Sequence, residues 1–210
     1  MINDPLITVA GFVIALWLLR SWIADARHHA KTGHIRPYAF PGATWTAPAI
    51  SLIGAGLAIV LVLLYSWFEW SLGIHTLQST LSFWQIPAIL AAPVIEEIVF
   101  RGYLVIPSRG RKLLILSIVI SSLLFALMHP YGWAITVPDS IFDLSSWSIR
   151  LTPDLQFLLT TLYLFLLSLL CFALRFHPGN PNHSLLPCFW AHLAANVSVL
   201  AVKLSQGFVS

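Results

Sequence analysis

The sequence predicts an all-α fold: a polytopic bundle of about six transmembrane helices around a polar intramembrane cavity. Three observations lead to this prediction. The chain of 210 residues is 58% hydrophobic and only 9% charged, whereas an ordinary soluble domain has about 25% charged residues. Apolar stretches of about 20 residues, long enough to cross a hydrocarbon core of about 30 Å, recur along the chain. A few ionisable residues nevertheless lie inside these stretches.

The expected spans follow one another with short connections. They cover residues 5–23, 46–68, 85–106, 112–128, 155–174 and 185–204. Between them, residues 24–45 suit a loop or a short interfacial helix, and residues 130–154 suit a longer loop with acidic side chains at Asp139, Asp143 and Asp154. Nothing between the spans is long enough for a separate soluble domain. We therefore expect a single membrane domain over residues 1–210, surrounded by membrane lipids.

The basic residues predict an orientation. No Lys or Arg precedes the first span, and several follow it. This pattern is typical of an anchor with its N-terminus outside rather than of a cleaved leader. With this orientation, the cytoplasmic loops and their flanks hold Arg20, Arg27, Lys31, Arg36, Arg109, Arg111, Lys112 and Arg175, and the opposite face holds only Arg150 and Lys203. This bias agrees with the positive-inside rule. The formal charge of +3 therefore indicates topology, and we expect no nucleic-acid partner.

Two other residue types fit the same picture. Cys171 and Cys188 fall in apolar spans and form no CxxC pair, so we predict small buried thiols rather than a redox or zinc site. Five tryptophans near span ends are expected to lie at the headgroup boundary as anchors: Trp22, Trp45, Trp67, Trp70 and Trp84.

The third span contains three ionisable residues in the segment Glu96-Glu97-Ile-Val-Phe-Arg101. Such groups cost at least a few kcal/mol each in the hydrocarbon region, so they indicate a function. Glu97 and Arg101 are four residues apart on a helix and can form a neutralising pair. Glu96 is rotated by about 100° from Glu97 and has no evident intrahelical partner, which makes it the candidate general base. The alternative is that all three form a polar network that only holds helices together.

Histidines mark two further spans. Phe125-Ala-Leu-Met-His129 closes the fourth span, and His192-Leu-Ala-Ala-Asn196 lies in the sixth. Because residues at i and i+4 share a helix face, His192 and Asn196 are expected to face one cavity. The alternatives are an interfacial role for His129 and an interhelical hydrogen-bonding role for the other two residues.

Together these residues suit amide hydrolysis by water. That reaction needs a base for the water, donors for the developing oxyanion and a proton for the leaving amine. We assign Glu96 as the base, His129 as its partner in binding the water, and His192 with Asn196 as oxyanion donors. The preferred mechanism needs no cofactor. Glu96, His129 and His192 could instead hold a zinc ion that leaves one position for water, and although no HExxH motif is present, this metal-bound alternative stays open.

The three motifs, in this order on membrane helices, resemble the CPBP family of intramembrane endopeptidases. This family includes the type II CAAX prenyl endopeptidases and bacterial proteins linked to bacteriocin processing or self-immunity. The likeness covers residues 85–200, the expected protease core, and extends to Phe100-Arg101-Gly102 and Ser184-Leu-Leu-Pro187.

The resemblance implies a fold, an activity and roles for individual residues. It implies a helix bundle around a polar cavity, activation of water by Glu96 with His129, and oxyanion stabilisation by His192 and Asn196. The expected substrate is a membrane-anchored protein or peptide, prenylated or otherwise lipid-anchored, and the bacterial members of the family make a bacterial inner (cell) membrane the expected location. Members of the family have been described both as metalloproteases and as glutamic proteases.

Two other functions compete with proteolysis. Buried Glu, Arg and His residues also mark the pathways of proton- or ion-coupled transporters, but no inverted repeat is evident. A non-catalytic scaffold or immunity protein would keep the helices without needing all four polar residues.

The expected depths of the site residues in the membrane disagree with a single site. Counted from the cytoplasmic ends of their spans at about 1.5 Å per residue, Glu96, His129 and His192 lie at depths of about 15, 25 and 10 Å. Helix tilt, a longer third helix or an earlier start of the sixth would level them.

Overall fold

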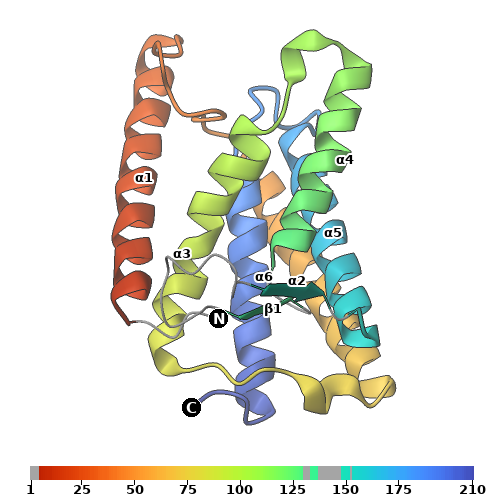
Figure 1. The fold of residues 1–210 in the computed structure, drawn as a ribbon. Coiled ribbons are helices and arrows are strands. Elements are labelled where there is room, and N and C mark those ends of the chain that lie inside the picture. The colour runs from red at the N-terminus through yellow and green to blue at the C-terminus, as the bar shows by residue number, and fades with distance from the viewer. Residues whose placement is uncertain (1–4, 130–132, 137–147, 152) are drawn as a thin grey trace.

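The computed structural model describes residues 5–129, 133–136, 148–151 and 153–210. Within these residues six helices are long and apolar enough to cross a membrane (Figure 1), and they cover Thr8–Thr32, Pro48–Ser71, Phe83–Tyr103, Arg111–Met128, Leu155–Arg175 and Leu186–Ser205. Large apolar side chains such as Leu52, Leu63 and Leu158 are exposed on the outside of the bundle, where lipid would cover them. The predicted helical membrane bundle is confirmed.

The first two helices flank the loop at one end of the bundle. Helix α1 spans Pro5–Thr32 and α2 spans Pro48–Ser71. The prediction of a loop or short interfacial helix from residue 24 is wrong for residues 24–32, which continue α1 without a break. These residues are mostly Ala, Arg, His and Lys, and Ala, Arg and Lys favour helix even outside an apolar run.

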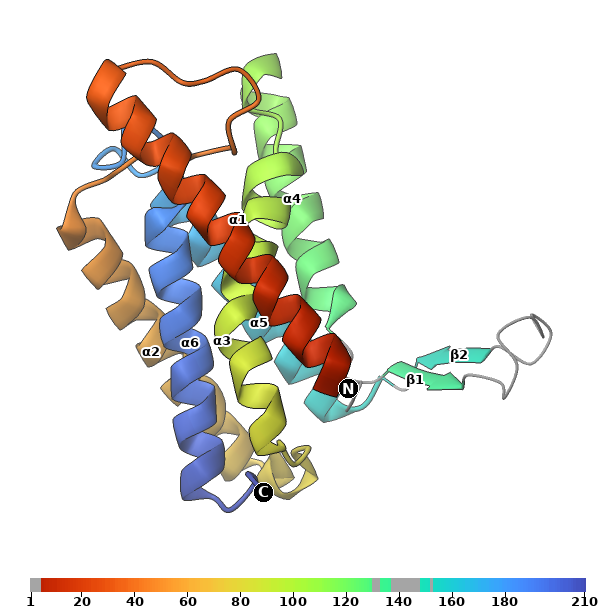
Figure 2. The same ribbon diagram turned by 90° about the vertical axis from the view of Figure 1, so that its left-hand side faces the viewer.

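Helix α6, Leu186–Ser205, lies between α2 and α3 (Ile86–Glu96). It packs against α2, α3 and α5 (Leu155–Arg175), while α1 covers α3 from outside and α4 (Arg111–Met128) packs against α5. Figures 1 and 2 show this arrangement from two sides. Residues on α3 and α6 can therefore meet inside the bundle.

The third span changes its helical geometry halfway along. The α-helical part ends at Glu96, and Glu97–Tyr103 continues as the π-helix η3, in which hydrogen bonds join residues five apart. Pro93 lies inside α3 and has no N–H to donate to the preceding turn. The span opens with the 3-10 turn η2 (Phe83–Gln85), and two further 3-10 turns flank it: η1 (Ile74–Leu77) precedes it and η4 (Pro107–Arg109) follows it.

Helices α4 and α6 are staggered along the bundle axis. Figure 2 shows that α4 begins well beyond the start of α6 and ends well short of the other end of α6.

The segment after α4 includes two short antiparallel strands, β1 (Trp133–Thr136) and β2 (Ser148–Leu151), with Trp133 opposite Leu151. Of the predicted acidic loop residues, Asp139 and Asp143 lie outside the described residues, and Asp154 caps α5 by accepting a hydrogen bond from Phe157 N at 2.7 Å.

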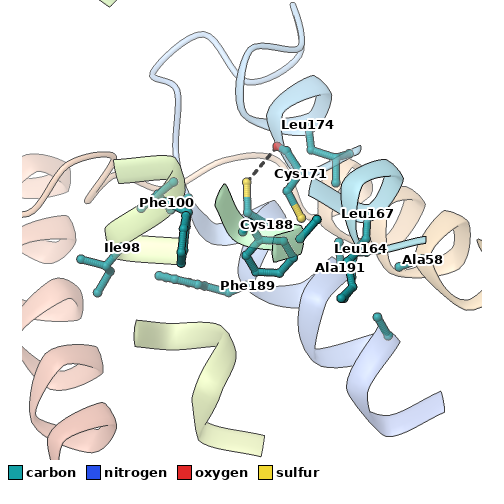
Figure 3. Close-up of a cluster of buried hydrophobic side chains, with 14 of the residues drawn as sticks. Ala58, Ile98, Phe100, Leu164, Leu167, Cys171, Leu174, Cys188, Phe189 and Ala191 are labelled. Carbon is teal, nitrogen blue, oxygen red and sulfur yellow. Dashed lines mark hydrogen bonds between the residues drawn. The ribbon is translucent and has the colours of Figure 1, made fainter. Parts of the chain in front are cut away.

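The core lies where α5 and α6 meet η3, as Figure 3 shows. Cys171 and Cys188 are free and buried, and the Cys188 thiol donates to the Cys171 carbonyl at 3.1 Å, so the prediction of buried thiols is confirmed. The prediction that Trp22 is an interfacial anchor is wrong. Its side chain is fully buried and packs edge-on against Phe189 and Trp45, because α1 turns this face toward the bundle.

Candidate active site

The side chains of the three motifs meet in the middle of the bundle. Glu96 and Glu97 lie at the junction of α3 and η3, His129 follows the last residue of α4, and His192 and Asn196 lie on α6. Phe125 on α4 connects them: its ring lies 4.8 Å from the His129 ring and 5.6 Å from the His192 ring, centre to centre. The phenylalanine of the Phe-x-x-x-His motif is thus the wall against which both histidines pack.

A buried chain of charged side chains runs from η3 to α6. Arg101 Nη1 lies 3.1 Å from Glu97 Oε1, and both side chains are fully buried, so the predicted neutralising pair is confirmed. The same Glu97 oxygen lies 2.7 Å from His192 Nδ1. Since a carboxylate only accepts hydrogen bonds, His192 donates from Nδ1. Glu97 therefore neutralises Arg101 and also orients the histidine of α6.

Arg101 has a second contact that suits its burial. Its guanidinium carbon lies 4.1 Å from the centre of the Phe125 ring, a distance at which a cation is attracted to an aromatic face. Ser121 on α4 donates to the Phe100 carbonyl of η3 at 2.7 Å. These contacts hold η3 against α4, which bears the Phe-x-x-x-His motif.

Glu96 differs from Glu97 in its surroundings. Its side chain is 26% exposed, and its Oε2 atom lies 3.7 Å from His192 Nε2, beyond hydrogen-bond distance. Among the described residues, Glu96 Oε2 has no hydrogen-bond partner. The two adjacent glutamates thus contact opposite nitrogens of one imidazole. Glu97 binds it directly, and Glu96 keeps an oxygen that can accept a hydrogen bond from a bound molecule.

His129 is oriented by its own helix. Its Nδ1 lies 2.8 Å from the Phe125 carbonyl one turn earlier. A carbonyl oxygen only accepts, so Nδ1 carries the proton in this contact and, in the neutral ring, Nε2 has a lone pair. That nitrogen can accept a hydrogen bond from water.

Asn196 bridges α6 to α3 through a carbonyl that a proline has freed. Its Nδ2 donates to the Ile89 carbonyl at 2.8 Å. In an α-helix this carbonyl would accept from the N–H of residue 93, but Pro93 has none. The side-chain amide supplies the missing donor, as backbone groups inside a membrane require. One N–H of the Asn196 amide remains for another acceptor.

The stagger of α4 resolves the mismatch of depths. The third span ends at Tyr103 and α6 begins at Leu186, so neither the longer third helix nor the earlier sixth helix is observed. Instead α4 starts farther out than α6 and ends partway along it (Figure 2). His129 at the end of α4 therefore comes level with residues in the first half of α6.

Two cavities meet at these residues. One of about 120 Å³ is lined by His129, His192 and Asn196 together with side chains of α2 and α5. The other, of about 390 Å³, lies between α3 and α6 and is lined by Glu96, His129 and Asn196 at one end. The prediction that His192 and Asn196 face a common cavity is confirmed, and we call the larger cavity the α3–α6 groove.

The zinc alternative can be compared with this geometry. No group of three His, Cys, Asp or Glu side chains in the described part of the chain is close enough to hold a metal ion. His192 uses Nδ1 for Glu97 and His129 uses Nδ1 for its own helix, which leaves Nε2 of both rings free, as in histidines that bind zinc. The obstacle is the spacing: as arranged, the side chains of Glu96, His129 and His192 do not converge on one point.

The sequence analysis missed a second polar cluster at the far end of the cavities. Glu69 and Lys203 are buried there, although both lie near span ends, and Lys203 was counted as a charge of the outer face. The missed signal is that each sits within a helix whose neighbouring residues are apolar.

The fold and the group formed by Glu96, His129, His192 and Asn196 define a class of protein: a polytopic membrane protein with a carboxylate, two histidines and an amide around an internal cavity. The family model described as type II CAAX prenyl endopeptidase Rce1-like matches residues 78–198. The match covers more than half of the chain, which therefore belongs to this family of CAAX-type membrane endopeptidases. No curated protein and no solved structure matches the chain significantly.

Proposed function

We propose that the protein hydrolyses a peptide bond of a membrane-anchored, lipid-modified protein or peptide by means of a glutamate-activated water. The observation that carries this proposal is the position of Glu96. Its Oε2 atom lacks a hydrogen-bond partner among the described residues and lies 3.7 Å from His192 Nε2, and its side chain lines the α3–α6 groove beside His129 and Asn196.

In this mechanism the water lies between Glu96 and His129. His129 Nε2 and the free oxygen of Glu96 accept its two hydrogen bonds and direct its oxygen lone pair to the substrate carbonyl. Glu96 takes a proton as the water oxygen attacks the carbonyl carbon, and the carbonyl π electrons move to oxygen. His192 Nε2, when protonated, and the second N–H of Asn196 donate to that oxyanion.

Collapse of the tetrahedral intermediate completes the reaction. The oxyanion reforms the carbonyl, the C–N bond breaks, and Glu96 returns its proton to the leaving nitrogen. The products are a carboxylic acid and an amine, and Glu96 is again a carboxylate. Arg101 and Glu97 touch no reacting atom in this scheme; they are positioning residues that hold His192 in place.

The test is cleavage of a panel of prenylated and otherwise lipid-anchored peptides by the purified protein in detergent. Glu96→Gln should reduce cleavage by at least about a thousandfold, because the amide cannot take the proton. A matched control is Asp25→Asn. Asp25 lies toward the C-terminal end of α1, where its carboxylate accepts a hydrogen bond from Phe40 N at 3.1 Å. That variant should cleave like the wild type.

A strong chelator separates the two mechanisms. Cleavage that persists under chelation and disappears in Glu96→Gln supports the glutamate-activated water. Cleavage lost under chelation and restored by zinc would replace it with the metal mechanism. Equal activity of wild type and Glu96→Gln would refute the assignment of the base and favour transport or a scaffold role.

A further inference from the structure

Lys203 is a buried cation that the proposed mechanism does not use. It lies in the last turn of α6 and is only 5% exposed, although lysine is almost never buried without a partner. Its Nζ donates to the Ser79 carbonyl at 2.6 Å. An ammonium has three donors, so this contact leaves two for other acceptors. Residue 203 also lies outside the segment that matches the family model.

The neighbouring acid does not form an ion pair with it. Glu69 accepts from the Tyr65 hydroxyl at 2.6 Å and from Gln78 Nε2 at 2.7 Å, through different oxygens. Among the described residues, no Lys203–Glu69 contact falls within the 4.0 Å of a salt bridge. Glu69 lines only the smaller cavity, whereas Lys203 lines both. Among the described residues, the α3–α6 groove is therefore lined by a cation at this end and by no acid there, although Glu69 lies nearby in the smaller cavity.

The rest of the groove is apolar. Glu96, His129 and Asn196 lie at one end, and Lys203 with Ser79 at the other. The walls between these ends are formed by Leu81, Ala88, Ile89, Ala92, Val199 and Leu200. A peptide segment with small or apolar side chains and one negative charge complements such a groove.

The length of the groove sets the distance between that charge and the bond that is cut. Lys203 is seven residues from Asn196, so it lies on the same face of α6 at a rise of about 10.5 Å, and eleven residues from His192, a rise of about 16.5 Å. An extended peptide advances about 3.3 Å per residue. The distance corresponds to roughly three to five residues.

We propose that Lys203 is a specificity-determining residue that binds a carboxylate of the substrate about three to five residues from the scissile bond. The proposal rests on the proposed function, because the groove is taken to hold a peptide. The carboxylate has two sources with the same chemistry, the C-terminus of the peptide or an Asp or Glu side chain. A purely structural role, in which Lys203 only holds the segment around Ser79, predicts no preference for acidic peptides.

The test compares lipid-anchored peptides of one sequence that differ only in charge: a C-terminal acid, the C-terminal amide, and the amide with Asp or with Asn at the fourth position after the bond. For wild type, kcat/KM should be about ten- to a hundredfold higher for the acid or the Asp peptide, the size of a hydrogen bond to a charged group. Which of the two is preferred identifies the source of the carboxylate.

The variants then assign the preference to one residue. Lys203→Met should lose the preference, mainly through KM, while Lys203→Arg should keep most of it because the charge remains. Lys112→Met is the matched control, since Lys112 is exposed at the start of α4, and it should behave like wild type. If Lys203→Met slows acidic and neutral peptides equally, the residue is structural and the proposal is refuted.

A binding measurement keeps this test independent of catalysis. Fluorescence anisotropy of the same peptides on Glu96→Gln should show about tenfold or greater selectivity for the acidic peptide, absent in Glu96→Gln/Lys203→Met. Selective binding by a wild type that cuts no peptide would refute the proposed function and leave the Lys203 site intact. Equal binding of acidic and neutral peptides would refute the Lys203 site.

Discussion

Replacing Asn196 and Pro93 separately and together tests whether Asn196 supports the helices, the reaction, or both. Asn196→Ala removes the donor that serves the Ile89 carbonyl at 2.8 Å. Pro93→Ala restores the backbone N–H that serves this carbonyl in an ordinary α-helix. In the double variant, the helix itself should therefore satisfy the carbonyl that Asn196→Ala leaves unpaired.

The expected changes in stability follow from this exchange. Interhelical hydrogen bonds in membranes contribute about 0.6 kcal/mol on average and up to about 2 kcal/mol, so Asn196→Ala should lower the free energy of unfolding by about 1 to 2 kcal/mol. In the Pro93→Ala background the same change should cost about 1 kcal/mol less, because Ile89 keeps a partner. This coupling between the two positions corresponds to about a fivefold difference in the unfolding constant.

The assay is reversible unfolding in mixed micelles for all four proteins of the cycle, with peptide cleavage measured in parallel. The stability changes caused by Asn196→Ala and Pro93→Ala should not be additive. Cleavage should stay low in the double variant, because loss of an oxyanion donor lowers kcat about a hundred- to a thousandfold. A double variant that regains cleavage would refute the oxyanion role of Asn196. Additive stability changes would refute the exchange at Ile89.

Two further predictions concern the packing around the site. Arg101→Met should destabilise the protein by about 3 to 5 kcal/mol, because it leaves the Glu97 carboxylate buried without its cation. Adding Glu97→Gln should recover most of this stability in thermal unfolding. It should not recover cleavage, since His192 loses its carboxylate acceptor. Gly42→Ala should destabilise more than Gly33→Ala: both glycines have positive φ, but only at Gly42 would the new methyl meet a backbone oxygen at 2.8 Å, whereas the space at Gly33 is open. Equal melting temperatures of the two glycine variants would contradict this explanation.

The features that the sequence predicted correctly depend on one helix at a time. The spans follow from runs of apolar residues, and the Glu97–Arg101 pair follows from a spacing of four residues. Even there the local geometry differs, because Glu97 opens a π-helix, yet the two side chains still meet at 3.1 Å. That Glu96 has no partner on its own helix follows for the same reason, since no basic residue lies one turn away from it.

The features that could not be predicted depend on how two helices are placed relative to each other. The hydrogen bond between His192 and Glu97 joins residues 95 positions apart and requires one particular rotation of α6 against η3. Pro93 signals that the Ile89 carbonyl needs a donor, but the sequence does not say that Asn196 provides it. A tryptophan near a span end suits both the membrane interface and the protein core, so only the packing of α1 decides where the Trp22 side chain lies.

The position of His129 has a consequence for how the protein can be altered. Its ring is oriented by the Phe125 carbonyl and packed against the Phe125 ring, so all of its described anchors lie within the last turn of α4. The connection between α4 and α5 begins only after this residue. We therefore expect that this connection can be shortened, lengthened or exchanged between relatives without moving the histidine. Natural variation and engineered loop grafts can change what approaches the site while the chemistry at its centre stays the same.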